Sequence, residues 1–424
     1  MFGALIDDDH FRHRIYLFQS HQAMKLRSGY PFWLIKHGLP FDYPKLERSN
    51  RADVVIMGGG ISGALMAYHL IMAGVDCMLV DARTIGLGST CASTSLLQYE
   101  IDTPLCKLKD MVGLQNAVRS YQCCVKAIHA LGEIAAQIKF NDFEYKPSLY
   151  FAAFKKDVSF LKEEFSLRKL HGFKVEYLGA NELSDQFNFK APGAILSEVG
   201  AQTNAYSFTH ALLQFAIKKG MQVFDRTAIV KIQHDKGGVT LITENGFNIK
   251  TKKLVYATGY EAVRYIDEKI VDLHSTYACT SEQVNKKKEF WRNDALIWNT
   301  ADPYLYMRNT KDGRILIGGR DESFYDPVKR DKLLDKKTRQ LVKDFNNVFP
   351  HITFKPEFSW AGTFGATADG LPFIGNYKKL PNSLFALGFG GNGITFSLVA
   401  AEILTNMITG HNNTDASIFS FDRI

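Results

Sequence analysis

One glycine-rich turn constrains the fold of this chain more than any other feature. Residues 54–57 (VVIM) form a short apolar run of the kind that becomes a buried parallel strand. Gly58, Gly60 and Gly63 then fit the pattern G-x-G-x-x-G, whose glycines allow a tight turn, the close approach of a pyrophosphate and close packing of helix on strand. We expect the helix from Ser62 to about Ala73, with its first N–H groups directed at an anion.

The segment after this helix completes a nucleotide-binding pattern. Cys77–Val80 is expected to form a second strand. Asp81 follows it, 18 residues after Gly63, close to the spacing of about twenty at which an acid binds a ribose. A glycine turn that binds nothing is the alternative, and the complete order of strand, turn, helix, strand and acid disfavours it. The unit predicts a bound dinucleotide without specifying which one.

The composition excludes several classes of function. The chain has 424 residues, enough for two or three domains, and is 46% hydrophobic and 22% charged, as in ordinary globular proteins. The net charge of +7 is thinly spread, and the basic run Lys286–Lys288 is expected to be a solvated turn, so we expect no nucleic-acid partner. The six cysteines form no C-x-x-C pair, which predicts reduced thiols and no metal site.

The hydropathy pattern bears on location. The first residues, MFGALIDDDHFRHR, contain acids where a secretory leader needs an apolar core, so we expect no export. No apolar run approaches the length of about 18 residues that a membrane span requires. The sequence therefore predicts a cytoplasmic protein without a membrane span.

Outside the glycine turn, helical and β-rich stretches alternate. Helices are expected over Leu105–Lys139 and Phe208–Lys219, and short strands over parts of residues 149–200. Lys252–Tyr260 is expected to be another buried strand, and the chain past it is β-rich. Cofactor-type segments are thus separated by β-rich segments, which predicts interleaved domains.

Two further features favour FAD over NAD. The segment GLGSTCASTSLLQYE, directly after the second strand, offers small and hydroxyl side chains that can bind phosphates and ribityl oxygens at close range. Near the C-terminal end, GFGGNGIT (Gly388–Thr395) forms a second glycine turn before an apolar helix expected from Thr395 to about Thr409. A helix N-terminus there would stabilise the negative charge that a flavin gathers on reduction.

At this point the chain resembles the D-amino acid oxidase, glycine oxidase and sarcosine oxidase family of FAD-dependent oxidoreductases. The resemblance runs from about Ala52 to Gly410. It rests on five blocks in the family's order: VVIMGGGISG…VDAR, GSTCAST, VYATGY, YLYMRNTKDGRILIGGRDE and WAGTFGATADGLPFIG…ALGFGGNGIT. Each block is weak evidence alone, whereas five in order are strong.

The resemblance implies an α/β fold, α+β overall. A Rossmann-like FAD-binding domain with a parallel sheet, discontinuous in sequence, would stand beside a substrate domain with a large, mostly antiparallel sheet. The expected division is an N-terminal strap (1–50), an FAD-binding domain (51–105, 201–262 and 355–424) and a substrate-binding domain (106–200 and 263–354).

The resemblance also implies which positions would contact FAD, and it places them in groups along the cofactor. These are Gly58, Gly60, Ile61, Ser62 and Gly63 at the pyrophosphate, Asp81, Ala82 and Arg83 at the adenosine ribose, Gly88, Ser89, Thr90, Ser93 and Thr94 along the centre, Ile229 at the adenine, Ala257, Thr258 and Gly259 near the pyrophosphate and ribose, and Gly362, Gly391, Asn392, Gly393, Ile394 and Thr395 at the isoalloxazine and ribityl chain. In the alternative reading, Ser93 and Thr94 only cap a helix and the second group of glycines serves only its turn.

Departures from the family's pattern concern the substrate. Where relatives place arginines for a substrate carboxylate, this chain has Ser95 and Gln98 in one block and Thr363-Phe364 in another. Either Arg308 or Arg320 replaces them, or the substrate is an amine without a nearby carboxylate, which the polar Ser95 and Gln98 favour slightly. The WAGTF stretch lacks the cysteine that tethers flavin in sarcosine oxidases, so FAD should be non-covalent.

The candidate substrate-facing residues are few. They are Gln98, Tyr304, Tyr306 and Arg308. Alternation along a strand puts both tyrosines on one side, although two core tyrosines and a structurally paired arginine are equally good readings.

The expected activity is oxidation of a C–N bond of an amine or amino acid. Hydride would pass to flavin N5, and the resulting imine would hydrolyse. Oxygen or another electron acceptor would reoxidise the flavin. The alternatives are a dehydrogenase that uses a non-oxygen acceptor and an FAD-binding protein without turnover. The oligomeric state is not specified by the sequence.

Overall fold

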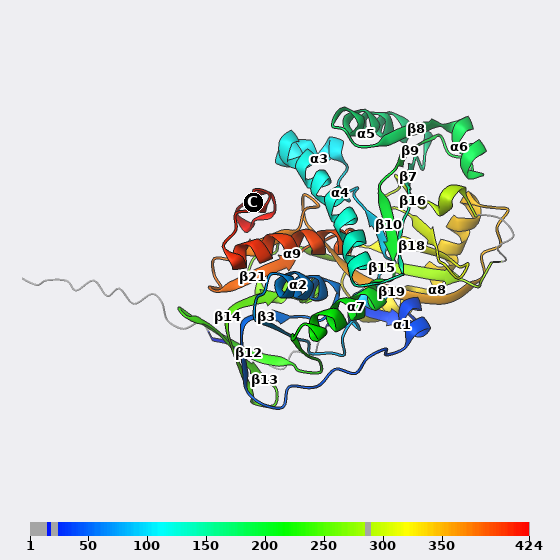
Figure 1. The fold of residues 1–424 in the computed structure, drawn as a ribbon. Helices are drawn as coiled ribbons and strands as arrows, with labels where there is room; N and C mark the ends of the chain where they lie inside the picture. Colours follow the sequence, from blue (N-terminus) through cyan, green and yellow to red (C-terminus); the bar gives the residue numbers. More distant parts are fainter. Residues whose placement is uncertain (1–14, 18–23, 285–289, 424) are drawn as a thin grey trace, which may run out of the picture.

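The computed structural model describes residues 15–17, 24–284 and 290–423. The acidic N-terminal stretch and the basic run Lys286–Lys288, for which the sequence predicts no leader and a solvated turn, lie outside the described residues. Among the described residues, two nine-stranded sheets lie side by side (Figure 1). No helix in this part of the chain is long and apolar enough to cross a membrane.

The first sheet has a parallel centre formed by segments far apart in the sequence. Its central strand pairs are all parallel: β14 with β3, β3 with β4, β4 with β11, and β14 with β21. An antiparallel meander of β12, β13 and β14 extends one side. The strands are β1 (Ile15–Leu17), β3 (Asn50–Met57), β4 (Cys77–Val80), β11 (Gln222–Phe224), β12 (Ile229–Asp235), β13 (Gly238–Thr243), β14 (Asn248–Tyr256), β20 (Phe373–Asn376) and β21 (Ser383–Leu387).

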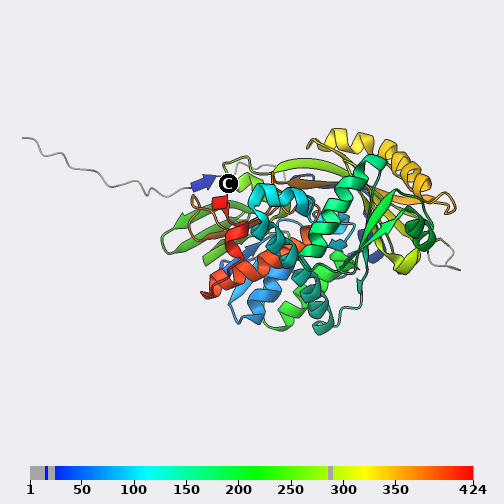
Figure 2. The same cartoon turned by 90° about the horizontal axis from the view of Figure 1, so that it is seen from above.

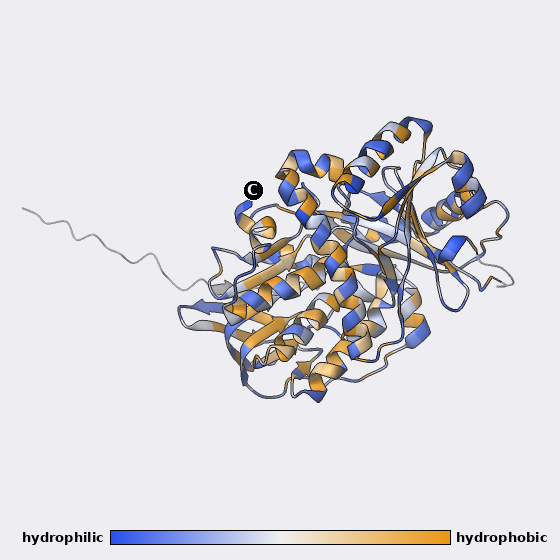
Figure 3. Ribbon diagram, turned by 45° about the horizontal axis from the view of Figure 1, so that its top comes forward, coloured by the Kyte–Doolittle hydropathy of each residue, from blue (hydrophilic) through white to orange (hydrophobic). Residues whose placement is uncertain are grey.

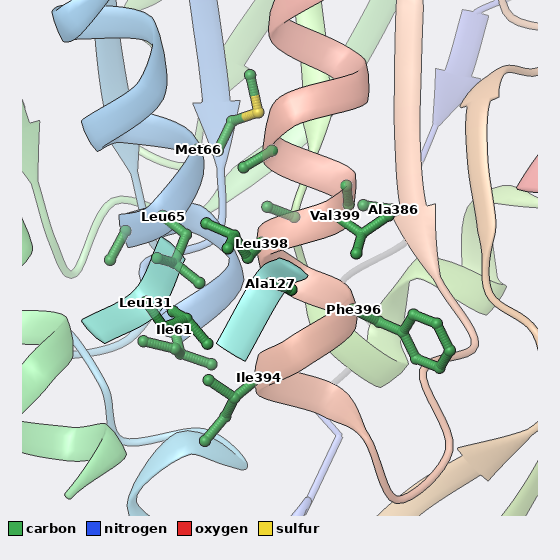
Figure 4. Packing of buried hydrophobic residues seen from close by; sticks show 14 of the residues in the cluster. Ile61, Leu65, Met66, Ala127, Leu131, Ala386, Ile394, Phe396, Leu398 and Val399 are labelled. Carbon is green, nitrogen blue, oxygen red and sulfur yellow. The ribbon is translucent and has the colours of Figure 1, made fainter. Parts of the chain in front are cut away.

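Three apolar helices cover one face of this sheet. They are α2 (Ile61–Met72), α7 (Ala205–Lys218) and α9 (Gly393–Thr409), and α2 packs between the other two. Figure 4 shows Leu65 of α2 against Leu398 of α9, with Leu131 of the long helix α4 (Leu114–Gln137) beside them. Figure 3 shows these strands and helices as mostly hydrophobic, as expected for elements buried between layers.

The second sheet is antiparallel except where β16 pairs with β7. Helix α8 (Pro327–Val348) packs on one of its faces through Leu341 and Phe345, on the opposite margin of the molecule from α2 and α9 (Figure 2). The strands are β2 (Arg27–Gly29), β7 (Ser148–Phe151), β8 (Val175–Gly179), β9 (Gly193–Ser197), β15 (Asp272–Ser281), β16 (Leu296–Asn299), β17 (Tyr306–Asn309), β18 (Ile315–Glu322) and β19 (Pro356–Ala366).

Several elements differ from the sequence-based expectation. The helix expected over Leu105–Lys139 is two helices, α3 (Leu105–Val112) and α4, because Gly113 between them has a φ of 81°. The helices α5 (Val158–Leu170), α6 (Ala180–Phe187) and α8 were not expected. Strand β14 ends at Tyr256, so that Ala257 and Thr258 form a loop and Gly259 and Tyr260 begin a 3-10 helix (Gly259–Tyr265).

The arrangement of the sheets bears on the proposed domain division. Segments β3–β4, β11–β14 and β20–β21 meet in the first sheet although long stretches separate them in sequence. Strand β19, which the division places in the FAD-binding domain, pairs with β15 in the second sheet. A small sheet of β5 (Leu96–Gln98), β10 (Gly200–Thr203) and β6 (Phe143–Tyr145) is a separate unit. Helix α1 (Phe32–His37) lies in the N-terminal strap.

Candidate active site

The first glycine turn brings strand, helix and loop into close contact. Strand β3 ends at Met57, and α2 begins at Ile61. A Cβ on Gly63 would lie 1.8 Å from the carbonyl oxygen of Gly58, so only glycine lets α2 pack against the turn. Gly58 has a φ of 115°, which other residues rarely adopt. The motif therefore forms the tight turn that the sequence predicts.

Asp81, directly after β4, is hydrogen-bonded to this turn. Its two carboxylate oxygens accept hydrogen bonds from the backbone N–H groups of Gly59 and Arg83, each at 2.6 Å. Burial raises the pKa of Asp81 to about 6, although these two hydrogen bonds and the charge of Arg83 act in the opposite direction. The guanidinium of Arg83 donates to both oxygens of Glu261, at 2.7 and 2.8 Å.

A long cavity of about 810 Å³ is lined by the first glycine turn and by the segments that follow β4 and β14. Figure 4 shows Ile61 and Ile394 close together, near the N-termini of α2 and α9, and both line this cavity. The residues predicted to contact FAD that line it are Gly58, Gly60, Ile61, Ser62, Asp81, Ala82, Arg83, Gly88, Ser89, Thr90, Ser93, Ile229, Ala257, Thr258, Gly259, Gly393 and Ile394.

The lining of the long cavity fits a ligand rich in hydrogen-bonding oxygens. The hydroxyls of Ser89 and Thr258 are buried and have no hydrogen-bond partner within the described part of the chain. Unpaired buried hydroxyls are costly, so partners supplied by a ligand would stabilise them. The N-terminus of α2 opens on the same space and favours a phosphate.

A smaller inner cavity of about 150 Å³ adjoins the long one and shares Ser89, Ser93, Tyr260 and Ile394 with it. Three predicted substrate-facing residues, Gln98, Tyr304 and Tyr306, line this cavity. It is also lined by Thr94, Ser95, Thr276, Asp321, Trp360, Gly362, Thr363, Phe364 and Gly391, among others.

Other predicted cofactor residues lie outside both linings or are already engaged. Gly63 is buried beneath the turn, while Asn392 donates to the carbonyl oxygens of Gln98 and Glu100 at 3.0 and 2.7 Å. Thr395 donates to the Gln98 carbonyl oxygen at 3.4 Å. The backbone N–H of Gly391, which lines the inner cavity, donates to Asp102 at 2.7 Å. These groups therefore fix the second glycine turn.

Arg308 does not line the inner cavity, which favours the structurally paired arginine of the two readings that the sequence left open. Its side chain is 2% exposed, it donates to the Thr203 carbonyl oxygen at 2.9 Å, and it lies over the Trp33 ring. It lines a different cavity beside α1. Burial lowers its pKa to about 10.

Arg320 is also outside the inner cavity, and a β-bulge is the reason. In the pairing of β15 with β18, Ser275 lies opposite Glu322 but Tyr277 lies opposite Gly319, so β18 contains one extra residue. Gly318 faces Tyr306, and regular alternation would put Arg320 on that same face. The bulge instead directs Arg320 to Asp344 of α8 and Asp321 into the cavity wall.

Three acids at the site were not expected from the sequence: Asp102, Glu261 and Asp321. Asp321 stands in the recognised block GGRDE, but strand alternation alone favours Arg320 at the cavity. Asp102 follows β5 in a loop, and Glu261 lies in a short 3-10 helix after β14 (Gly259–Tyr265); neither segment has a periodic signal.

Comparisons with known proteins agree with this architecture. The model of the family "FAD dependent oxidoreductase" matches residues 53–407. Gamma-glutamylputrescine oxidoreductase of Escherichia coli (strain K12) is 24% identical over 88% of this chain and 86% of its own length. Glycine oxidase of Bacillus licheniformis is 23% identical over 85% of this chain and 94% of its own length.

Solved structures share the fold at low identity. Glycine oxidase from Geobacillus kaustophilus superimposes with a TM-score of 0.73 at 18% identity, covering 87% of this chain and 98% of that chain. L-proline dehydrogenase from P. horikoshii gives a TM-score of 0.74 at 18% identity, covering 88% and 97%. Since the family model spans most of the sequence and the fold agrees, the chain belongs to the family of FAD-dependent oxidoreductases.

Proposed function

We propose that this protein oxidises a C–N bond of an amine that has no carboxylate beside the reacting carbon. One observation carries this proposal: no cationic side chain is present among the described residues that line the inner cavity. A small α-amino acid bound there would leave its carboxylate without a charged partner, at a cost of several kcal/mol. The relatives named glycine oxidase and gamma-glutamylputrescine oxidoreductase support C–N oxidation in general.

The long cavity is the proposed FAD site. Its glycine turn and the N-terminus of α2 would hold the pyrophosphate, and Asp81 would accept hydrogen bonds from the ribose. The unpartnered hydroxyls of Ser89 and Thr258 would bind cofactor oxygens, and Ile229 would pack against the adenine. FAD, when bound, supplies the capacity to accept two electrons from the substrate.

The residues of the inner cavity would position the amine and exclude water. The side-chain amide of Gln98 donates to the Ser148 hydroxyl at 3.0 Å, so its carbonyl oxygen remains to accept a hydrogen bond from a substrate N–H. Tyr304 and Tyr306 form one wall, with ring centroids 5.8 Å apart. A neutral reacting amine requires no general base, so the protein's contribution is orientation.

Anaerobic flavin bleaching tests this proposal. The purified holoenzyme would be mixed with uncarboxylated amines and, separately, with glycine, sarcosine and D-alanine. We expect amines to bleach the flavin at least about tenfold more efficiently, the effect of one lost charged contact. Equally efficient bleaching by glycine or D-alanine would contradict the proposal that the substrate has no carboxylate beside the reacting carbon.

The same preparation addresses the electron acceptor and the mode of FAD attachment. Oxygen consumption during turnover would identify an oxidase, whereas dye reduction without oxygen uptake would identify a dehydrogenase. Acid precipitation should release FAD, because no cysteine stands in the WAGTF block. A protein that no amine bleaches would be an FAD-binding protein without turnover.

The domain division and the cytoplasmic location are also part of the proposal. The parallel centre of the first sheet, built from three separated segments, supports a discontinuous FAD-binding domain. All six cysteines are free and buried, which suits a reducing compartment.

A further inference from the structure

The wall of the inner cavity combines a carboxylate with aromatic rings. Asp321 lines the cavity, and its Oδ1 has no hydrogen-bond partner among the described residues. Tyr260, Tyr304 and Tyr306 line the same space. A second acid, Asp102, lies behind Tyr304 and accepts a hydrogen bond from its hydroxyl at 3.0 Å. The lining of the cavity therefore combines a carboxylate with aromatic side chains.

The charges around Asp321 leave its carboxylate unneutralised inside the cavity. Burial raises its pKa, as do the charges of Asp102 and Asp302, while a hydrogen bond with Thr276 and the charge of Lys337 act in the opposite direction. Lys337, however, belongs to α8, and its ammonium donates to the Arg320 carbonyl oxygen at 2.8 Å and to Glu322. The bulge in β18 also places Arg320 on the α8 side of the sheet. Both cations, Lys337 and Arg320, therefore lie on the side of β18 away from the inner cavity.

We propose that Asp321, with Tyr304 and Tyr306, forms a subsite for a second, protonated nitrogen of the substrate, so that the substrate is a small aliphatic diamine. This inference rests on the proposed function. An ammonium group pairs with a carboxylate and is attracted to the faces of aromatic rings, so it suits both parts of this wall.

The two nitrogens of such a substrate have different tasks. The reacting nitrogen has to be neutral for the adjacent C–H to leave as hydride, whereas alkylamines are protonated near neutral pH, with pKa values of about 10. A carboxylate beside the reacting nitrogen would favour its unreactive form. Asp321 therefore binds the distal ammonium and leaves the reacting nitrogen to Gln98.

A comparison of a diamine with a matched monoamine tests the subsite. The variants are Asp321→Asn and, as control, Glu322→Gln, the neighbouring acid that bonds to Lys337 on the α8 side. For the wild-type holoenzyme and both variants, kcat/KM would be measured with 1,4-diaminobutane and with butylamine. Binding of the diamine to the dithionite-reduced holoenzyme would be measured by calorimetry, which gives a Kd without turnover.

We expect the wild type to prefer the diamine. Asp321→Asn should lower kcat/KM for the diamine about 10- to 100-fold, mainly through KM and with a matching rise in Kd, which is the range for a lost charge-assisted hydrogen bond. In Asp321→Asn, kcat/KM for butylamine should change less than about threefold. Glu322→Gln should leave kcat/KM for both substrates unchanged. Equal losses for both amines in Asp321→Asn, or no diamine preference in the wild type, would overturn the subsite.

The design separates failure of the subsite from failure of the proposed function. Turnover of butylamine without diamine preference leaves amine oxidation in place and excludes the subsite. Bleaching only by glycine or sarcosine, with neither amine active, excludes the proposed function itself.

The pH dependence gives an independent readout of the same group. The pKa of Asp321 is raised to about 6, chiefly by burial. Below that pH the carboxyl is neutral and cannot pair with an ammonium, so KM for the diamine should rise as the pH falls through about 6. The Asp321→Asn variant should not show this rise of KM at low pH. If the variant still shows the rise, another group is responsible for it.

Discussion

Asp102 connects the hydroxyl of Tyr304, 3.0 Å from its Oδ1, with the backbone N–H of Gly391, 2.7 Å from its Oδ2. Tyr304 precedes β17 in the second sheet, and Gly391 belongs to the turn before α9, which covers the first sheet. One carboxylate thus joins the wall of the inner cavity to the second glycine turn. Burial raises its pKa, and both hydrogen bonds oppose that rise.

Breaking this connection should misplace Tyr304. We predict that Asp102→Ala and Tyr304→Phe each lower kcat/KM for the best amine substrate about tenfold, and that the double variant loses little more than either alone. The coupling energy of such a cycle should be about 1–2 kcal/mol, as for directly bonded side chains. Strictly additive effects would show that the two residues act independently.

The contact of Gly63 with Gly58 gives a prediction about the turn itself. Gly63→Ala places a methyl group where only 1.8 Å separates it from the Gly58 oxygen, so α2 has to shift. We expect a loss of stability of about 1–3 kcal/mol, the usual cost of overpacking, and an FAD affinity reduced at least about tenfold. Thermal unfolding and fluorescence titration of the apoprotein measure these effects.

The control is Gly237→Ala, since a Cβ on Gly237 has nothing within 4 Å. That variant should bind FAD as the wild type does. Wild-type affinity in Gly63→Ala would contradict the close packing of α2 on the turn.

The sequence predicts those parts of the site that depend on local pattern. The turn at Gly58–Gly63, the strand before it and Asp81 follow from spacing alone, because a βαβ unit fixes all three within about thirty residues. Both tyrosines of the YLYMR block line the inner cavity, Tyr306 from β17 and Tyr304 from the loop just before it.

What could not be predicted depends on one-residue irregularities and distant contacts. Asp321 lies at the cavity in place of Arg320 because β18 has a bulge opposite Thr276. Apart from Gly319, nothing in the sequence indicates this bulge. Arg308 is held by Thr203, a partner 105 residues away. Helix α8 was not expected because two positions of its buried face are charged, Arg330 and Lys337.

A buried ionic cluster below the site gives a further prediction. Glu164 accepts hydrogen bonds from Arg168 at 2.7 Å and from the backbone of Leu105 and Cys106 at 3.0 and 2.8 Å, and both charged side chains are fully buried. Glu164→Gln should lower the unfolding free energy by about 3–5 kcal/mol, because it removes a negative charge that neutralises the buried guanidinium of Arg168. Chemical denaturation of the apoprotein measures this loss.

The neighbouring Glu163 is the matched control. Its side chain is 59% exposed and pairs with Lys109 at the surface, so Glu163→Gln should change stability by less than about 1 kcal/mol. Equal effects of the two substitutions would show that the buried cluster contributes no more than a surface pair.

Asp81 provides a prediction for pH dependence with a defined sign. Its pKa is raised from 3.8 to about 6 in the folded chain, mainly by burial, so the folded apoprotein takes up a proton at a pH where the unfolded chain does not. The stabilising contribution of this proton uptake is therefore complete below about pH 3.8 and lost as the pH rises through about 6. Asp81→Asn removes the titrating group and shifts stability by a constant amount.

The difference in unfolding free energy between wild type and Asp81→Asn should thus move in favour of the wild type as the pH falls from 7 to 4.5. Denaturation of both apoproteins at several pH values measures it, and the comparison cancels the contributions of other carboxyl groups. FAD binding should show the opposite trend, since an ionised Asp81 is the better acceptor for ribose hydroxyls. The wild-type dissociation constant for FAD should rise as the pH falls below about 6, and a flat profile that matches Asp81→Asn would exclude Asp81 as the ribose ligand.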